Sequence, residues 1–170
     1  MRSKLIAFFI STVFHLQGIY MSSLALSYVV NLLARREYSE FELRNKMQEK
    51  AFTEDEIDET IAYCQTKNWQ NDKRFAENYL HARSQRGYGV NRIKQELRQL
   101  KGVPSEVINE VLTESEINWT EIAEKVLRKK FPNYAEPQTI NSKQKIWQYM
   151  LSHGFYSEEF SDFIGNGIED

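Results

Sequence analysis

The sequence predicts an all-α fold built from three tandem three-helix repeats that form an elongated, curved array. The 170 residues include only seven glycines and three prolines, too few turn formers for a many-stranded sheet, which favours helices joined by short loops. Apolar residues recur with helical spacing, in a pattern that returns about every fifty residues. A composition of 41% hydrophobic and 27% charged residues is that of an ordinary folded domain in water.

We expect the repeats to occupy residues 21–70, 71–117 and 118–170. Each contains a helix pair whose apolar residues lie four apart within a helix and five or six apart across the connecting turn. The three sets are Leu43, Met47, Phe52, Ile57 and Ile61; Ile93, Leu97, Val103, Ile108 and Leu112; and Ile146, Met150, Phe155, Phe160 and Ile164. The second set has one extra residue at the turn. A third helix precedes each pair, and stacking of such small units predicts an extended concave surface.

Residues 1–20 form an apolar leader in which two basic residues precede the run LIAFFISTVF. This run is too short to span a bilayer, and we expect no membrane association. Three origins fit it: a start codon assigned too early, a structured apolar extension, or an export signal. The nearest cleavage pattern, Ser23-Leu24-Ala25, would trim a predicted helix. We therefore favour Met21 as the true start.

Capping patterns place the helix starts. Ser39 with Glu42, and Thr53 with Glu56, fit the capping box, in which a hydroxyl and a carboxylate satisfy amides of the first turn. Counting back from the first apolar residue of each helix pair gives the caps Ser39, Gly89 and Ser142, followed three residues later by Glu42, Arg92 and Lys145. A cation in the first turn opposes the helix dipole by about 0.3–1 kcal/mol. We interpret the two cations as signs of an anionic partner.

Basic residues concentrate in the second repeat, although the chain has a net charge of −2. Residues 83–101 contain six cations and only one acid, Glu96. We expect Ile93, Leu97 and Leu100 to form the buried stripe of the helix, with basic residues on both flanks. The candidate residues for binding a partner or DNA are Arg35, Arg36, Arg83, Arg86, Arg92, Lys94, Arg98, Lys101, Lys125, Arg128, Lys129, Lys130 and Lys145. The alternative for any one basic run is a solvated face.

Catalytic chemistry is not indicated. The three histidines, His15, His81 and His153, are scattered over the repeats, and Cys64 is the sole cysteine, so neither zinc spacing nor a thiolate pair is present. The element RGYG has no preceding strand and is best explained as a helix-to-helix turn. We expect no metal, no cofactor and no enzymatic activity. We expect Cys64 to be a packing residue, which favours the reducing cytoplasm.

Two segments resemble the signature segments of the RecX family, regulators of the bacterial RecA recombinase. They are LLARREYSEFELRNKM, residues 32–47, and RFAENYLHARSQRGYGVNRIKQELRQLKGV, residues 74–103. The matching features are the Leu-Ala-Arg-Arg run ahead of Ser39, the Glu42-Leu43 pair, the Phe75-Ala76 pair and the run from Arg83 to Ile93. The resemblance spans about residues 24–164. The chain departs from the family in carrying Asn71 and Asp72 where the family has a pair of acids.

The resemblance implies an all-helical protein without enzymatic activity that binds the RecA filament on single-stranded DNA. It implies suppression of ATP hydrolysis, of strand exchange and of cleavage of the SOS repressor. We expect a cytoplasmic monomer with some weak direct binding to DNA. An independent helical DNA-binding or architectural module also fits the basic residues, and an enzyme is the third class considered.

Overall fold

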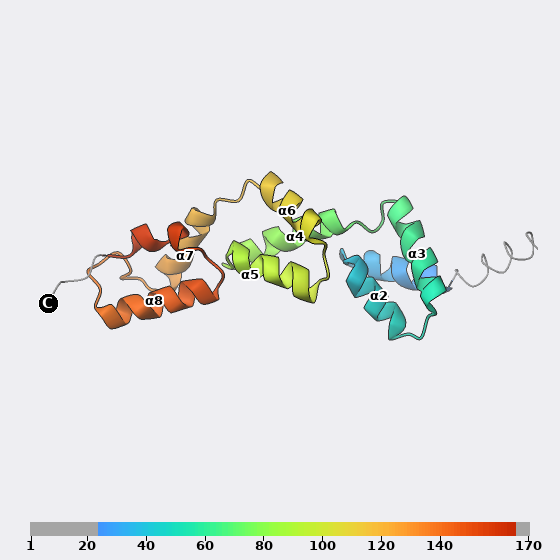
Figure 1. Cartoon of the computed structure of the whole chain (residues 1–170), viewed down its shortest axis with the longest axis horizontal. Coiled ribbons are helices and arrows are strands. Elements are labelled where there is room, and N and C mark those ends of the chain that lie inside the picture. Colours follow the sequence, from blue (N-terminus) through green and yellow to red (C-terminus); the bar gives the residue numbers. More distant parts are fainter. Residues whose placement is uncertain (1–23, 166–170) are drawn as a thin grey trace, which may run out of the picture. The chain divides into compact units, whose positions relative to one another are not determined.

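The computed structural model describes residues 24–165, and every regular element in this range is helical (Figure 1). Residues 24–33 are helical. The elements that follow are α2 (Glu40–Gln48), α3 (Glu54–Thr66), α4 (Asp72–Gln85), α5 (Val90–Gln95), η1 (Glu96–Leu100), α6 (Ser105–Glu114), α7 (Trp119–Lys130), α8 (Ile140–Ser152), η2 (Ser157–Glu159) and η3 (Ser161–Phe163). The apolar leader and the choice of start codon lie outside the described residues.

The chain divides into two compact units, Met1–Asp72 and Lys73–Asp170. The first unit holds the first repeat, and the second unit holds the other two. Among residues 24–165, no helix combines the length and the apolar character needed to cross a membrane.

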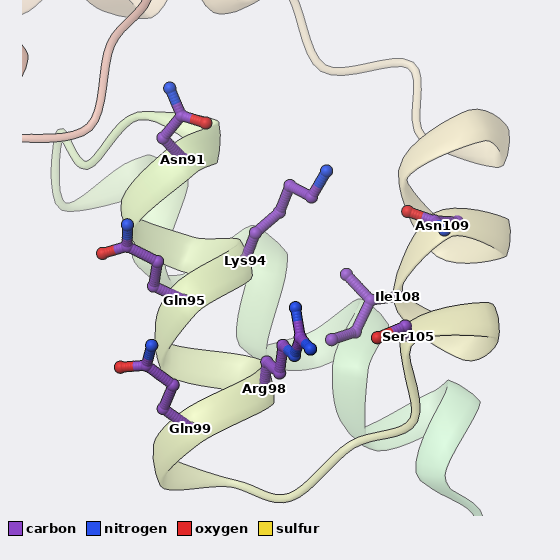
Figure 2. Close-up of a pocket in the computed structure, with 8 residues that line it drawn as sticks. All are labelled: Asn91, Lys94, Gln95, Arg98, Gln99, Ser105, Ile108 and Asn109. Carbon is purple, nitrogen blue, oxygen red and sulfur yellow. The ribbon is translucent and has the colours of Figure 1, made fainter.

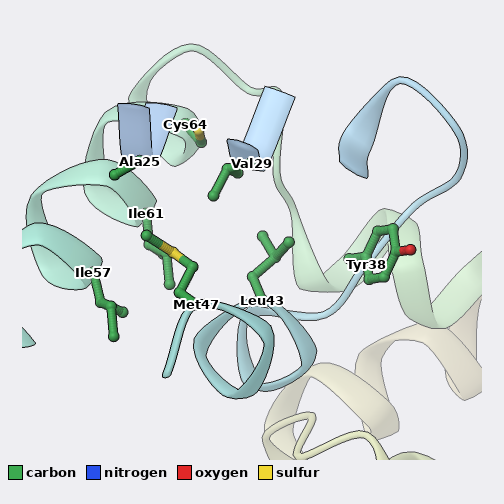
Figure 3. Close-up of a cluster of buried hydrophobic side chains, with 8 residues drawn as sticks. All are labelled: Ala25, Val29, Tyr38, Leu43, Met47, Ile57, Ile61 and Cys64. Carbon is green, nitrogen blue, oxygen red and sulfur yellow. The ribbon is translucent and has the colours of Figure 1, made fainter. Parts of the chain in front are cut away.

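The first repeat closes around one apolar cluster drawn from three helices (Figure 3). Residues 24–33 contribute Ala25 and Val29, α2 contributes Leu43 and Met47, and α3 contributes a matching stripe that ends at the buried thiol of Cys64. Burial raises the pKa of this thiol, as expected of a packing residue. Both predicted capping boxes are present, at the starts of α2 and α3.

The second unit contains two further clusters, one for each repeat. In repeat 2, α4 and α5 pack with α6 through Phe75, Ile93 and Ile108. Lys73 Nζ binds carboxylates of α6 at 2.7 and 2.8 Å and holds the start of α4 against that helix. In repeat 3, α7 and α8 pack around Leu127 and Phe155. The predicted apolar template is buried throughout, except for Phe52 and Leu112, which are half-buried.

The turn after the second helix is built the same way in each repeat. An amide donates to a carbonyl of the last buried residue: Phe52 to Met47 at 3.2 Å, Val103 to Leu97 at 3.0 Å, and Phe155 to Met150 at 3.2 Å. The residue just before each amide has a left-handed backbone, with φ of 59° at Ala51, 63° at Gly102 and 90° at Gly154. Two repeats use glycine, which adopts this conformation without strain.

The extra residue of repeat 2 is taken up inside the helix, in a π-turn. The segment η1 (Glu96–Leu100) is a π-helix, in which the Lys101 amide donates to the Glu96 carbonyl at 3.1 Å, five residues back. Leu100 is 63% exposed, so its predicted place in the buried stripe is wrong. An α-helical wheel put Leu100 beside Leu97, but the wider π-turn rotates it into solvent.

The third repeat departs from the predicted cap. Helix α8 begins at Ile140, and Thr139 accepts the amide of Ser142 as its N-cap. The predicted cap Ser142 is therefore wrong, and Lys145 lies beyond the first turn. The cap was predicted by counting back from the first residue of the buried stripe. That prediction failed because the helix begins one turn earlier, at Ile140, which is 77% exposed and so does not belong to the stripe. At the place of a third α-helix the chain forms the two 3₁₀ turns η2 and η3.

Within the second unit, the start of α5 meets the end of α8. The amides of Gly89 and Asn91 donate to the carbonyls of His153 at 2.8 Å and Gly154 at 3.0 Å. A Cβ on Gly89 would lie 2.4 Å from the Gly154 carbonyl, and a Cβ on Gly154 would lie 2.4 Å from the Arg92 amide nitrogen. Two glycines thus permit a backbone approach that no other residue allows.

Candidate functional site

The predicted basic residues fall into two groups, those that have partners within residues 24–165 and those that have none in this range. In repeat 1, Arg36 forms an ion pair with Glu42 at 3.0 Å and lies 3.5 Å from the centre of the Tyr38 ring. In repeat 2, Arg83 binds Glu96 and lies 3.8 Å from the centre of the Tyr88 ring. Both arginines stabilise their own repeat through a carboxylate and an aromatic face.

Arg92 occupies the third position of α5, after the N-cap Gly89, as the sequence predicted. Its Nε donates to Glu96 at 3.1 Å, and its Nη1 donates to the Ser152 carbonyl at 3.4 Å. The carbonyl end of α8 carries the negative pole of that helix. The anion that compensates this cation is therefore supplied by the fold. Sequence reasoning missed it because Ser152 stands sixty residues further along the chain.

Glu96 is the acid on which this cluster depends. Its carboxylate accepts hydrogen bonds from Tyr79 Oη at 3.0 Å, Arg83 Nε at 2.7 Å and Arg92 Nε. The side chain is only 11% exposed. Burial alone would raise the pKa of Glu96, but the hydrogen bonds from the two arginines and the tyrosine outweigh it and lower the pKa. The only acid among residues 83–101 is thus held ionised by its neighbours.

Four more predicted cations have internal partners. In α7, Lys125 pairs with Glu121 and Arg128 with Glu124, each at 2.7 Å and each one helical turn apart. The other two lie over aromatic rings, Lys101 at 5.7 Å from the centre of Tyr79 and Lys130 at 5.6 Å from the centre of Tyr149. Surface pairs of this kind contribute little stability and remain available to a partner.

The second group of predicted cations has no ion pair or side-chain hydrogen bond within residues 24–165. Its members are Arg35, Arg86, Lys94, Arg98, Lys129 and Lys145. Arg35 and Lys145 are exposed and stand alone. The other four gather in pairs in two grooves of the second unit, so the structure unites some of the predicted residues and separates others.

The α5–α6 groove is the larger of these two, with a volume of about 480 Å³. Its lining residues are Asn91, Lys94, Gln95, Arg98, Gln99, Ser105, Ile108 and Asn109. In Figure 2, Lys94 and Arg98 extend from α5 and η1 toward α6, while Gln95 and Gln99 follow one side of the same helix. Ile108 belongs to the core, and the remaining lining is polar.

The α4–α7 groove is the smaller one, of about 340 Å³. Its cations are Arg86 from the turn after α4, and Lys125 and Lys129 from α7; Ile122 and Val126 form its apolar floor. At the edge of this floor, a Cβ on Gly87 would lie 2.8 Å from Val126 Cγ2, and Gly87 has φ of 83°. Glycine is needed at this turn for the close approach.

Sequence reasoning missed the amide side chains of the α5–α6 groove. Asn91, Gln95 and Gln99 lie four residues apart along one helix, whereas Asn109 lies on α6, across from Lys94. Their side chains make no hydrogen bond within residues 24–165. The four-residue spacing of these amides was visible in the sequence, but the prediction considered only charged side chains and therefore left them out. Each amide both donates and accepts, so the groove offers mixed hydrogen bonding beside two cations.

Metal chemistry finds no support in the part of the chain that the structure describes. Among residues 24–165, no three histidine, cysteine or acidic side chains lie close enough to hold a metal ion. Both grooves present cationic side chains, Lys94 and Arg98 in one and Arg86, Lys125 and Lys129 in the other.

Family comparisons agree with the repeat boundaries seen in the fold. Residues 25–64 match the model for the first three-helix domain of RecX, residues 71–112 the second, and residues 117–164 the third. A crystal structure of a regulatory protein RecX shares the fold with a TM-score of 0.75 at 22% identity, covering 91% of this chain and 76% of the other. RecX from Lactobacillus salivarius gives a TM-score of 0.72 at 23% identity, covering 84% and 93%.

Closer relatives are named regulatory protein RecX. The protein from Haemophilus influenzae (strain PittEE) is 72% identical over 145 residues, which are 85% of this chain and 95% of that protein. The one from Mannheimia succiniciproducens is 68% identical over 150 residues, 88% of this chain and 98% of that protein. With three domain models and these identities in agreement, the chain belongs to the RecX family of regulatory proteins.

Proposed function

We propose that this protein binds the RecA filament on single-stranded DNA and acts mainly as an inhibitor of the recombinase. The inhibited activities would be strand exchange, DNA-dependent ATP hydrolysis and cleavage of the SOS repressor. Family membership supports a regulatory role. The observation that carries the contact with a polyanionic filament is the α5–α6 groove, where Lys94 and Arg98 have no ion pair or side-chain hydrogen bond within residues 24–165.

This role needs no catalytic residue. A ligand that binds one state of the filament more tightly than another shifts the filament toward that state. Occupying the site of an incoming duplex would have the same effect on strand exchange. We propose that the protein acts in the cytoplasm as a monomer, without enzymatic activity, cofactor or metal.

An independent DNA-binding or architectural module is the second candidate, favoured by the same unpaired cations. The experiment that separates the two candidates measures ATP hydrolysis by RecA on single-stranded DNA while the protein is titrated in, and DNA binding without RecA in parallel. The proposed function predicts suppression of hydrolysis at concentrations that leave bare DNA mostly unbound. Tight binding to bare DNA with no effect on hydrolysis by RecA would reject it in favour of the second candidate.

A further inference from the structure

The second helix of repeat 2 differs from its two counterparts by one residue. Five residues separate the paired amide and carbonyl in the turns that end at Phe52 and Phe155, whereas six separate Leu97 from Val103. The same turn hydrogen bond forms in all three repeats, so the loop has not absorbed the addition. The helix itself has widened over η1, the π-turn. Such turns are rare and occur often at functional sites.

The π-turn lies directly in the α5–α6 groove. Arg98 and Gln99 belong to η1, while Lys94 and Gln95 immediately precede it. Figure 2 shows Lys94 and Arg98 extending from this helix toward α6, while Gln95 and Gln99 leave the helix on its other side. Leu100 is displaced into solvent at 63% exposure. Exposing this apolar side chain to water is unfavourable, and the feature that accompanies it is the α5–α6 groove.

The lining selects among polyanions. A nucleic-acid strand offers phosphate oxygens to lysine and arginine, and base edges with both donors and acceptors to asparagine and glutamine. An acidic peptide offers carboxylates, and peptide interfaces generally rely on apolar anchors in the partner. Ile108, the apolar residue of the lining, is 3% exposed and offers such an anchor little surface. The amide of Asn109, which lies across the groove from Lys94, therefore favours a nucleic acid.

We infer that the π-turn Glu96–Leu100 builds a site for a single nucleic-acid strand in the α5–α6 groove, with Lys94 and Arg98 on its phosphates and Asn109 on its bases. The inference rests on the proposed function, in which the protein works on a filament that contains such a strand. It adds that this groove contacts the nucleic acid and that one inserted residue shapes it.

The test removes the inserted residue. Deletion of Gln99 restores the five-residue spacing of the other repeats, so the helix is expected to close as an α-helix and the protein to fold. Fluorescence anisotropy with a labelled oligothymidine should then show affinity reduced about tenfold, the effect of losing one well-placed charged contact. Gln99→Ala keeps the length of the turn and is the matched control, with a loss of at most about twofold.

Charge reversal tests the contacts. The double change Lys94→Glu with Arg98→Glu should weaken oligothymidine binding at least as much as the deletion, while Lys145→Glu, an exposed cation of α8, should change it little. A footprint on the unmodified protein needs no variant: bound oligothymidine should protect Lys94, and leave Lys145 open, to acetylation by an N-hydroxysuccinimide ester.

Several results would overturn the inference. Full binding by a folded Gln99 deletion would remove the role of the π-turn. If the deletion does not fold, unprotected Lys94 in the footprint would reject the site on its own. Binding of polyglutamate in preference to oligothymidine would replace the nucleic acid with an acidic peptide. Suppression of hydrolysis by RecA is read separately, so a failure of the proposed function appears there and a failure of this site appears in the oligothymidine binding.

Discussion

The starts of α2 and α5 are the same structural position in two repeats, yet they are completed in different ways. Helix α2 is capped by side chains: Ser39 accepts the Glu42 amide at 3.1 Å, Glu42 accepts the Ser39 amide at 3.4 Å, and Asp72 accepts the Glu40 amide at 2.8 Å. At α5 the cap is Gly89, which has no side chain, and Arg92 replaces the acid. Carbonyls at the end of α8 accept the amides instead.

The difference teaches that a cation at a helix start can be structural. Arg92 opposes the dipole of α5, but it also faces the negative end of α8 through the Ser152 carbonyl and is paired with Glu96. The start of α2 is therefore capped by side chains, whereas the start of α5 relies on backbone carbonyls of repeat 3. Lys94 and Arg98 have no ion pair or side-chain hydrogen bond of this kind within residues 24–165.

The largest effect is expected from breaking the contact between α5 and α8. Gly154→Ala would place a Cβ 2.4 Å from the Arg92 amide nitrogen, at a backbone φ of 90°. Overpacking and the left-handed backbone together should cost about 3 kcal/mol. Gly102→Ala is the matched control, since Gly102 is exposed and has φ of 63°, and should cost about 1 kcal/mol. Denaturant unfolding of both variants measures this, and equal losses would contradict the proposed role of the contact.

The next largest effect is expected from replacing Glu96, in comparison with Glu42. Glu96→Gln leaves Arg83, 16% exposed, without a carboxylate and should destabilise the protein by about 2 kcal/mol. Glu42→Gln should cost about 0.5 kcal/mol, because glutamine also completes a capping box and Arg36 is 49% exposed. Thermal unfolding followed by circular dichroism distinguishes them. A greater loss for Glu42→Gln would reverse the comparison.

Acid should change the contributions of Asp72 and Glu96 to stability in opposite directions. Burial raises the pKa of Asp72, more than the hydrogen bonds from the Glu40 amide and Gln70 lower it. A raised folded pKa contributes stability that is present at low pH and lost as the pH rises through that value. The pKa of Glu96 is lowered, so its contribution is present above the ordinary carboxyl range and lost as the pH falls through the folded pKa.

Melting curves from about pH 7 to about pH 3 test these signs. The deficit of Glu96→Gln relative to wild type should shrink as the pH falls. The deficit of Asp72→Asn should grow over the same range, because wild-type Asp72 gains stability on taking up its proton. Parallel curves for the variants and wild type would show that neither carboxyl has a shifted pKa.

The smallest effect should be a gain. Ala51 holds the left-handed turn position at which repeats 2 and 3 have Gly102 and Gly154. Ala51→Gly relieves this strain at some cost in chain entropy, and should raise stability by about 0.5–1 kcal/mol. A higher midpoint in urea would record the gain. A lower midpoint would mean that the turn of repeat 1 depends on the alanine side chain.

The repeat pattern made much of the fold predictable. Spacings of four and five placed Leu43, Met47, Ile146 and Met150 in cores, because helical periodicity is a local property. The caps at Ser39 and Thr53 were readable for the same reason. Asp72 shows the limit: its carboxylate caps α2 by accepting the Glu40 amide at 2.8 Å, across thirty-two residues.

The candidate site was less predictable. Counting cations identified Lys94 and Arg98, but could not separate them from Arg83 and Arg92, whose pairing depends on contacts with Glu96 and α8. The π-turn was visible only as one extra residue at a turn. Its consequence, an exposed Leu100, required the backbone.

The central claim is that paired cations build the fold and the unpaired cations of the α5–α6 groove carry the binding. The most direct test measures inhibition of ATP hydrolysis by RecA and melting temperature for two variants. Arg92→Glu should lower the melting temperature, because it opposes Glu96 and the end of α8. Lys94→Glu with Arg98→Glu should keep the melting temperature and weaken inhibition about tenfold or more. Full inhibition by the folded double variant would contradict the claim.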